Sequence, residues 1–156
     1  MYPLKWTYTR ARQRIQELPN WATPAEAFVL TLFFVEKIIR RTLVQIVIRK
    51  GKTPAKAFKT VRRLLGIVKV KEAWSNYDQG GRALQAVIGA AHWQRIEKAA
   101  KLRNALVHGS GHQAQKVYGR ELLHLRNTLD HIRNTFSNEY GYSGWKGMKD
   151  NAGNLL

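Results

Sequence analysis

Apolar residues recur at steps of three and four positions along most of the chain, and no segment alternates apolar and polar residues as a half-buried strand does. The clearest run goes from Tyr118 to Phe136, with apolar side chains at alternating steps of four and three. That period places the apolar residues on one face of a helix. We therefore expect an all-α fold, a bundle of about five helices.

Capping signals predict where these helices begin and end. Thr23-Pro24 opens one helix with a proline at its first position and Glu26 as the capping-box residue. This helix is apolar around most of its first half, so we expect it to be central and buried. Thr53-Pro54 opens the next in the same way. The expected helices cover residues 8–18 (ending at Pro19-Asn20), 24–49, 54–65, 82–88, 90–107 and about 118–140.

Two segments fit this pattern less well. Residues 66–79 contain Ile67, Val68 and Val70, which favour a short extended piece. After a domain at 1–140, the glycine-rich residues 141–156 predict a loose tail, with Trp145 as its candidate docking residue. Trp6, Trp21, Trp74 and Trp93 are expected in the core or at a dimer contact.

Length and composition limit the class of protein. A chain of 156 residues is expected to form one domain. It has no cysteine, which excludes disulfides and thiolate zinc sites and favours a reducing, cytoplasmic setting. The longest apolar stretch, 28–48, is interrupted by charged residues, and residues 1–18 lack the apolar core of a signal peptide. We expect a soluble protein without a membrane segment.

The charge balance points to a polyanionic partner. The chain carries 27 Lys and Arg against 10 Asp and Glu, a net charge of +17. Residues 37–71 hold twelve of the basic residues and no acidic one. Ordinary solvated surfaces mix both signs, so a binding face for RNA phosphates is favoured over a merely solvated helix or an acidic membrane surface. The candidate RNA-binding residues are Arg40, Arg41, Lys52, Lys56, Lys59, Arg62 and Arg63.

This basic face has a predicted geometry. Lys52, Lys56, Lys59 and Arg63 follow helical spacing, so they form a stripe on one side of their helix. The apolar residues Phe58, Val61, Leu64 and Leu65 are expected together on one side of the helix, opposite this stripe.

One motif carries candidate chemistry: Arg103 and Asn104 followed by His108 in the string LRNALVHG. Five residues apart in an unbroken helix, Arg103 and His108 point about 140° away from each other. If the helix unwinds near Val107, the glycines at 109 and 111 allow His108 to turn back toward Arg103. A histidine exchanges protons near neutral pH and an arginine binds phosphate oxygens, which suits metal-free RNA cleavage.

A structural role for the same residues has to be weighed. His108 is also suited to capping the end of its helix, and Arg103 to a solvated face. Arg126 and His131 repeat the spacing inside a helix without glycines. We expect this second copy to be non-catalytic. It remains a candidate to line the same groove as the first motif.

The string LRNALVHG, in an all-helical setting with a tryptophan segment before it, resembles the signature of the HEPN superfamily (higher eukaryotes and prokaryotes nucleotide-binding). Many members are metal-independent endoribonucleases, often toxins or anti-phage effectors, and homodimers whose motifs meet across the interface. The resemblance implies that Arg103 and His108 are catalytic, Asn104 orients the motif and Glu97 is the acid that supports the arginine. It implies no metal or cofactor, and an antitoxin or other neutralising protein as a partner. Ser110 stands where nucleotidylated members carry tyrosine, which argues against that regulation.

We therefore expect a metal-independent endoribonuclease that uses the RNA 2′-OH as nucleophile. The alternative is a non-catalytic RNA- or protein-binding module, in which the basic face supplies affinity and the motif is structural. Cleavage in EDTA separates the two.

Overall fold

The computed structural model describes residues 8–17, 23–108 and 115–156, and these form helices joined by turns. Outside the helices, the described residues contain one isolated β-bridge, between Lys149 and Leu155. The expectation of an all-α fold is confirmed. The helices are α1 (Tyr8–Glu17), α2 (Pro24–Arg49), α3 (Pro54–Arg62), α4 (Gly66–Trp74), α5 (Leu84–Ile88), α6 (Ala90–Val107) and α7 (Gln115–Tyr140).

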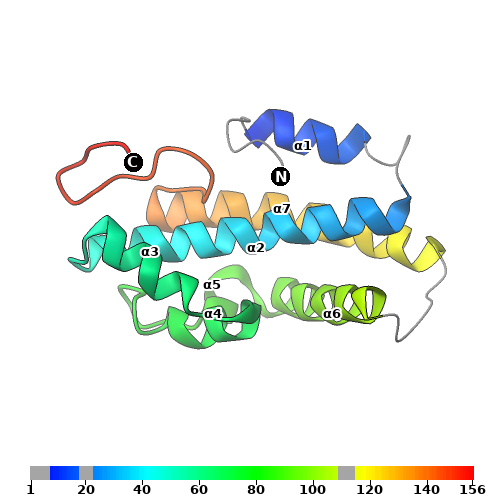
Figure 1. Ribbon diagram of the computed structural model, residues 1–156, viewed down its shortest axis with the longest axis horizontal. Coiled ribbons are helices and arrows are strands. Elements are labelled where there is room, and N and C mark those ends of the chain that lie inside the picture. Colours follow the sequence, from blue (N-terminus) through cyan, green and yellow to red (C-terminus); the bar gives the residue numbers. More distant parts are fainter. Residues whose placement is uncertain (1–7, 18–22, 109–114) are drawn as a thin grey trace.

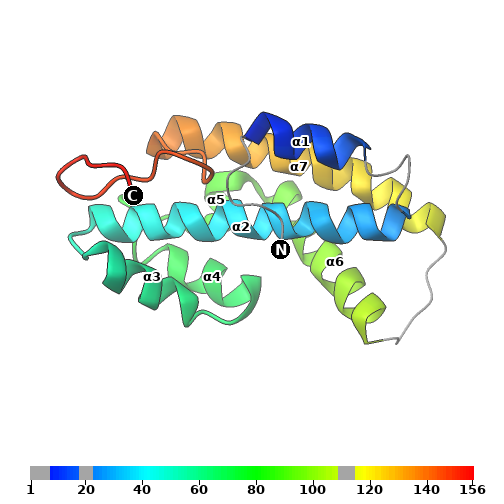
Figure 2. The ribbon, with the colours of Figure 1, turned by 45° about the horizontal axis from the view of Figure 1, so that its top comes forward.

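The two longest helices, α2 and α7, lie side by side and run in the same direction (Figure 1). At their starts the backbone N–H of Ala25 donates to Gln115 Oε1 at 3.2 Å, and at their ends Arg49 donates to the carbonyl of Tyr140. Figure 2 shows α1 on one side of this pair and α3, α4 and α6 on the other. Because α2 and α7 are parallel, α6 has to run back toward their starts, and its last turn diverges from α2 (Figure 2).

The central position of α2 is confirmed. Its start has the predicted capping box, with Thr23 Oγ1 accepting from the N–H of Glu26 and the Glu26 carboxylate accepting from the N–H of Thr23. Most apolar side chains from Phe28 to Ile48 are buried, although Phe33 is 52% exposed. The one hydroxyl-bearing residue in its first buried half, Thr31, donates to the carbonyl of Ala27 at 2.8 Å. The hydroxyl of this buried residue is therefore paired within the helix itself.

Residues 66–74 form helix α4, so the expectation of an extended piece there is wrong. Ile67, Val70 and Trp74 are buried at helical spacing, and the Trp74 ring stacks on Phe136 with centroids 5.3 Å apart. Burial of this face outweighs the strand preference of the β-branched residues. Trp74 and Trp93 are core residues as predicted. Trp6, Trp21 and Pro19-Asn20 lie outside the described residues.

A buried carboxylate fastens the turn after α4 to the end of α7. Asp78 Oδ1 accepts the hydroxyl of Tyr140 at 2.6 Å, and Asp78 Oδ2 accepts the backbone N–H groups of Gly80 and Arg82, both at 2.9 Å. The Arg82 guanidinium also pairs with Asp78, and it reaches Glu139 with its other end. Burial by itself raises the pKa of Asp78, but the hydrogen bonds from Arg82 and Tyr140 outweigh it and lower the pKa to about 2.

Residues 142–149 of the glycine-rich segment are packed on the fold, so the expectation of a loose tail is wrong for this part, while residues 151–156 are exposed. Trp145 is the predicted docking residue and is buried against Phe34, but Met148 is buried as well. The buried side chain of Gln45 pairs with the backbone of Lys149, donating to its carbonyl at 3.0 Å and accepting from its N–H at 2.8 Å. The glycine content predicted a flexible backbone, whereas the burial of Trp145 and the hydrogen-bonded side-chain amide of Gln45 hold this segment on α2.

Gly144 is where the tail comes closest to α2, and its replacement by alanine is expected to displace the tail. Gly144 has φ +77°, and a Cβ there would lie 2.5 Å from the carbonyl oxygen of Ile38. Gly153 has φ +87° with nothing within 4 Å of an added Cβ, so Gly153→Ala carries backbone strain without a collision. Limited trypsin digestion should cut at Lys146 and Lys149 much faster in Gly144→Ala than in Gly153→Ala. Equal rates would mean that the contact with Ile38 does not hold the tail.

Candidate active site and nucleic-acid interface

Arg103 lies on α6 where that helix faces α2. Its Nη1 donates to Glu36 Oε1 at 2.9 Å, and the two side chains are only 29% and 19% exposed. Its Nε and Nη2 both donate to Asn104 Oδ1 at 3.2 Å. A charge-assisted bond on one side and an amide on the other give the guanidinium a fixed orientation. The role of Asn104 in orienting the motif stays a prediction.

The guanidinium of Arg103 keeps donors for a ligand. An arginine has five N–H groups, and the bonds to Glu36 and Asn104 use three of them. No other hydrogen bond of Arg103 is found among the described residues, which leaves one N–H on Nη1 and one on Nη2. Two N–H groups of one guanidinium can hold two phosphate oxygens.

His108 is exposed at the C-cap of α6. Its backbone N–H bonds the carbonyls of Asn104 and Leu106, and its φ of −89° and ψ of 1° end the helix there. Because α6 is helical through Val107, Arg103 and His108 stay about 140° apart around the helix axis. The helix ends only at Val107, so no unwinding within α6 turns His108 back toward Arg103. The glycine turn at 109–111 and Ser110 lie outside the described residues.

Glu97 is not the acid beside Arg103, so that assignment is wrong. Six residues apart on α6, the two side chains point about 120° away from each other. Glu97 instead lies 3.8 Å from the Nζ of Lys71, which also sits 4.7 Å from the centre of the Trp93 ring. The acidic partner, Glu36, was missed because it comes from another helix. Its one sequence signal is a carboxylate that directly follows the mostly apolar run 27–35 of α2.

The second Arg-His pair lies at the other end of α6. His131 Nε2 donates to the carbonyl of Ile88 at 3.0 Å, and its ring stacks on His92 with centroids 3.8 Å apart. Burial, followed by the charges of His131 and Arg95, lowers the pKa of His92. His92 and His108 are sixteen residues apart on α6, or about 24 Å along its axis. His131 therefore does not line the same groove as the first motif; it packs α7 against the start of α6.

Two of the predicted RNA-binding arginines on α2 hold other parts of the fold. Arg40 Nη1 donates to the carbonyl of Leu64 at 2.9 Å, just beyond the end of α3. Arg41 Nε donates to the hydroxyl of Tyr142 at 3.2 Å, in the C-terminal segment. Both side chains stay half-buried and keep further N–H groups. Their charge still contributes to the surface, but their positions are fixed by internal contacts.

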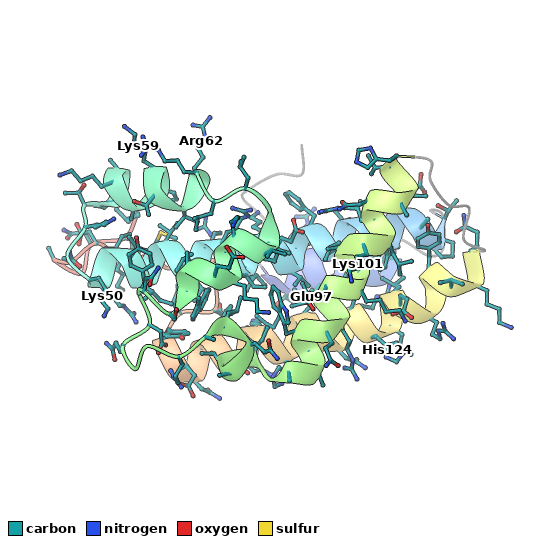
Figure 3. The ribbon with its side chains drawn as sticks, turned by 90° about the horizontal axis from the view of Figure 1, so that it is seen from below. Lys50, Lys59, Arg62, Glu97, Lys101 and His124 are labelled. Carbon is teal, nitrogen blue, oxygen red and sulfur yellow. The ribbon has the colours of Figure 1, made fainter. Side chains whose placement is uncertain are left out.

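The exposed basic face belongs to α3 and the turn after it. Lys52 is not part of this face, because its Nζ lies 3.3 Å from Thr60 Oγ1 and 5.5 Å from the centre of the Tyr77 ring. The other predicted residues are exposed and have no acidic partner among the described residues. Figure 3 shows Lys59 and Arg62 projecting from the outer side of α3. These exposed cations, which we call the α3 basic face, are Lys56, Lys59, Arg62 and Arg63.

The buried side of α3 differs from the prediction. α3 packs on α2 through Ala57 and Val61, which are one helical turn apart and buried. Phe58 is 45% exposed and Leu65 is 81% exposed, and Phe58 lines the same groove as Lys59 and Arg62 instead of lying opposite the basic residues. A helix of nine residues can turn only one narrow stripe toward α2, and the small Ala57 lets the helices approach closely there.

Two open grooves follow the exposed face of α2. The first, of about 720 Å³, lies between α2 and α3. The second, of about 1250 Å³, runs along the first half of α2 to the end of α6, and it includes Leu30, Phe33, Glu36 and Leu106. Arg40 and Arg41 line both grooves, so the α3 basic face and the Arg103–Glu36 pair are linked along one side of the molecule.

Comparison with known proteins does not place the chain in a family: no family model, curated protein or solved structure matches it. Within the described residues no helix is both long and apolar enough to span a membrane. In the same part of the chain, no three His, Asp or Glu side chains are grouped so that they could hold a metal ion.

Proposed function

We propose that this protein is a metal-independent endoribonuclease whose active site is built around Arg103 and His108. The observation that carries the proposal is the fixed guanidinium of Arg103, which Glu36 and Asn104 hold while two of its N–H groups remain for a ligand. It lies beside a groove that leads to the α3 basic face. A guanidinium fixed in this way suits a phosphate that gains charge in the transition state. The resemblance of LRNALVHG to the HEPN signature supports the same interpretation.

The proposed reaction is an internal transfer at one RNA phosphate. The 2′ oxygen forms a bond to phosphorus while its proton passes to a neutral His108 imidazole. The bond from phosphorus to the 5′ oxygen breaks, and the same His108 imidazole, now protonated, gives that proton to the leaving oxygen. The products are a 2′,3′-cyclic phosphate and a 5′-hydroxyl. Arg103 holds the non-bridging oxygens throughout.

The site is proposed to form in a homodimer. In one chain Arg103 and His108 diverge around α6, so a site that uses both needs one residue from each of two copies. A two-fold axis next to the motif brings the same patch from both subunits. The surface there is suited to contact, since Phe33 is 52% and Val107 is 68% exposed. Sedimentation that finds only monomer at micromolar concentration would contradict this arrangement.

The defining experiment uses purified protein, labelled RNA and EDTA. We expect cleavage of RNA and none of DNA of the same sequence, with a 2′,3′-cyclic phosphate on the upstream product. A single 2′-deoxy residue at a mapped cut site should protect that bond alone. A requirement for added metal would overturn the mechanism, and tight binding without cleavage would favour the non-catalytic binding module.

Affinity for RNA is proposed to come mainly from the α3 basic face. Lys56→Glu with Arg63→Glu should weaken binding and reduce the slope of log Kd against log salt by about one unit for each phosphate that is no longer neutralised. Lys69 and Lys71 make a matched control, because they are already paired with Glu72 and Glu97. Their double replacement by Glu changes the net charge equally but should leave the slope nearly unchanged. Similar slopes for the two double variants would assign binding to net charge alone.

A further inference from the structure

The groove between α2 and α3 combines an apolar floor with a cationic rim. α2 contributes Val44 with Arg40 and Arg41, and α3 contributes one helical stripe made of Ala55, Phe58, Lys59 and Arg62. Val61 closes the floor between the helices. The groove has four positively charged residues and no carboxylate among its lining side chains. Its volume of about 720 Å³ is within the range of small-molecule sites.

Phe58 is the unusual member of this lining. An aromatic ring that is 45% exposed keeps apolar area in water, although the neighbouring Ala57 and Val61 are buried. The ring stands beside Lys59 and Arg62, which have no acidic partner among the described residues. An exposed aromatic ring flanked by unpaired cations is the arrangement that binds an unpaired base and its phosphates.

The walls of the groove are already fixed. The bond from Arg40 to the Leu64 carbonyl fastens the end of α3 to α2, and the bond from Arg41 to the Tyr142 hydroxyl holds the Arg41 side chain in place. A ligand therefore does not have to order these elements when it binds, which lowers the entropic cost of binding.

We infer that this groove seats one unpaired nucleotide of a single-stranded RNA, with its base on Phe58 and its phosphates on Lys59 and Arg62. Charge complementarity selects a polyanion, and the ring selects one whose bases are free to stack. In a duplex the bases are paired inside the helix and cannot reach Phe58. The substrate class is therefore single-stranded or looped RNA. This inference rests on the proposed function, since it takes the ligand of the basic face to be RNA.

The seat lies away from the proposed cleavage point. Arg40 and Arg41 join this groove to the one that reaches Glu36, and Val44 and Glu36 are about 12 Å apart along α2. A strand seated on Phe58 is thus led along α2 toward Arg103. Phe58 would set which strands are held, without taking part in the reaction.

The test measures RNA affinity by fluorescence anisotropy in the His108→Ala background, so that the RNA stays intact. Phe58→Ala should weaken the binding of a labelled single-stranded RNA by about tenfold or more. The affinity for a duplex of the same sequence should change less than twofold. Phe58→Trp should restore single-strand binding, because it restores a stacking surface. Leu65→Ala is the matched control: Leu65 is more exposed than Phe58 but does not line the groove.

Lys59→Gln with Arg62→Gln tests the phosphate contacts. This double variant should lower the salt slope for single-stranded RNA by one to two units, while Phe58→Ala should leave the slope unchanged.

Several results would overturn the inference. These are an equal loss of single-strand and duplex binding in Phe58→Ala, no loss in either, or a loss in Leu65→Ala as large as that in Phe58→Ala. A membrane partner gives a different result. The wild type would bind vesicles that contain phosphatidylserine, and Phe58→Ala and Leu65→Ala would weaken that binding equally. If the wild type does not cleave RNA but Phe58→Ala loses single-strand binding, the seat stands and the nuclease proposal falls. If the wild type cleaves and Phe58→Ala binds normally, only the seat falls.

Discussion

Alanine at Arg103 or at His108 is expected to reduce RNA cleavage at least a hundredfold while changing RNA affinity by less than about threefold. Arg103→Ala removes the charge that offsets the transition state, and His108→Ala removes the proton carrier. Affinity should survive because the α3 basic face, on a separate helix, supplies most phosphate contacts. The measurement pairs single-turnover cleavage rates in EDTA with anisotropy on RNA that carries a 2′-deoxy cut site.

His131→Ala is the matched control for His108→Ala. His131 has the same spacing from an arginine but contacts the Ile88 carbonyl and His92, far from the motif. Its removal should leave the cleavage rate nearly unchanged. Cleavage that persists in His108→Ala, or that falls equally in His131→Ala, would contradict the proposed site.

The two inactive variants also test the dimer. If each site takes Arg103 from one subunit and His108 from the other, a heterodimer of Arg103→Ala and His108→Ala has one intact site and one with neither residue. A heterodimer purified through two different tags should therefore recover about half of the wild-type rate. No recovery would show that the arginine and histidine of one site come from the same chain.

Asp78→Asn is expected to destabilise the fold by about 3 kcal/mol. The amide removes the charge that pairs with Arg82. It also turns one oxygen into a donor that faces either Tyr140 or the backbone N–H groups of Gly80 and Arg82. Denaturant unfolding at neutral pH measures the loss. Glu72→Gln is the control, because Glu72 forms an exposed pair with Lys69 and should change stability by less than about 0.5 kcal/mol.

The pH dependence of stability should follow the same carboxylate. The pKa of Asp78 is about 2 in the folded protein, below its ordinary value of 3.8. In acid the Asp78 carboxylate is therefore protonated more readily in the unfolded chain than in the folded protein. The free energy of unfolding accordingly decreases as the pH falls from about 5 to about 2. The difference in unfolding free energy between wild type and Asp78→Asn should shrink across this window. A constant difference from pH 6 to pH 2 would mean that Asp78 is not held ionised by the fold.

The sequence by itself was sufficient for the features that local patterns encode. Apolar spacing identified every described helix except α4. Thr23 with Glu26 marked the start of α2 because a capping box is closed within one turn. Arg103, Asn104 and His108 were found as a group since they are close together in the chain, and the contact of Arg103 with Asn104 is local. The stretch without acidic residues was also visible, and it is the source of the α3 basic face.

Only the tertiary structure decided the contacts between segments that are far apart in the chain. Glu36 reaches Arg103 across 67 positions, so the acid nearer to Arg103 in sequence, Glu97, was the wrong choice. Periodicity indicates that α3 has an apolar side but not how much of it α2 can cover, and Phe58 was left exposed. The C-terminal segment is fixed because Gln45 on α2 satisfies its backbone at Lys149. Each of these outcomes depends on which surfaces meet, and packing of whole helices determines that, not the preference of any short segment.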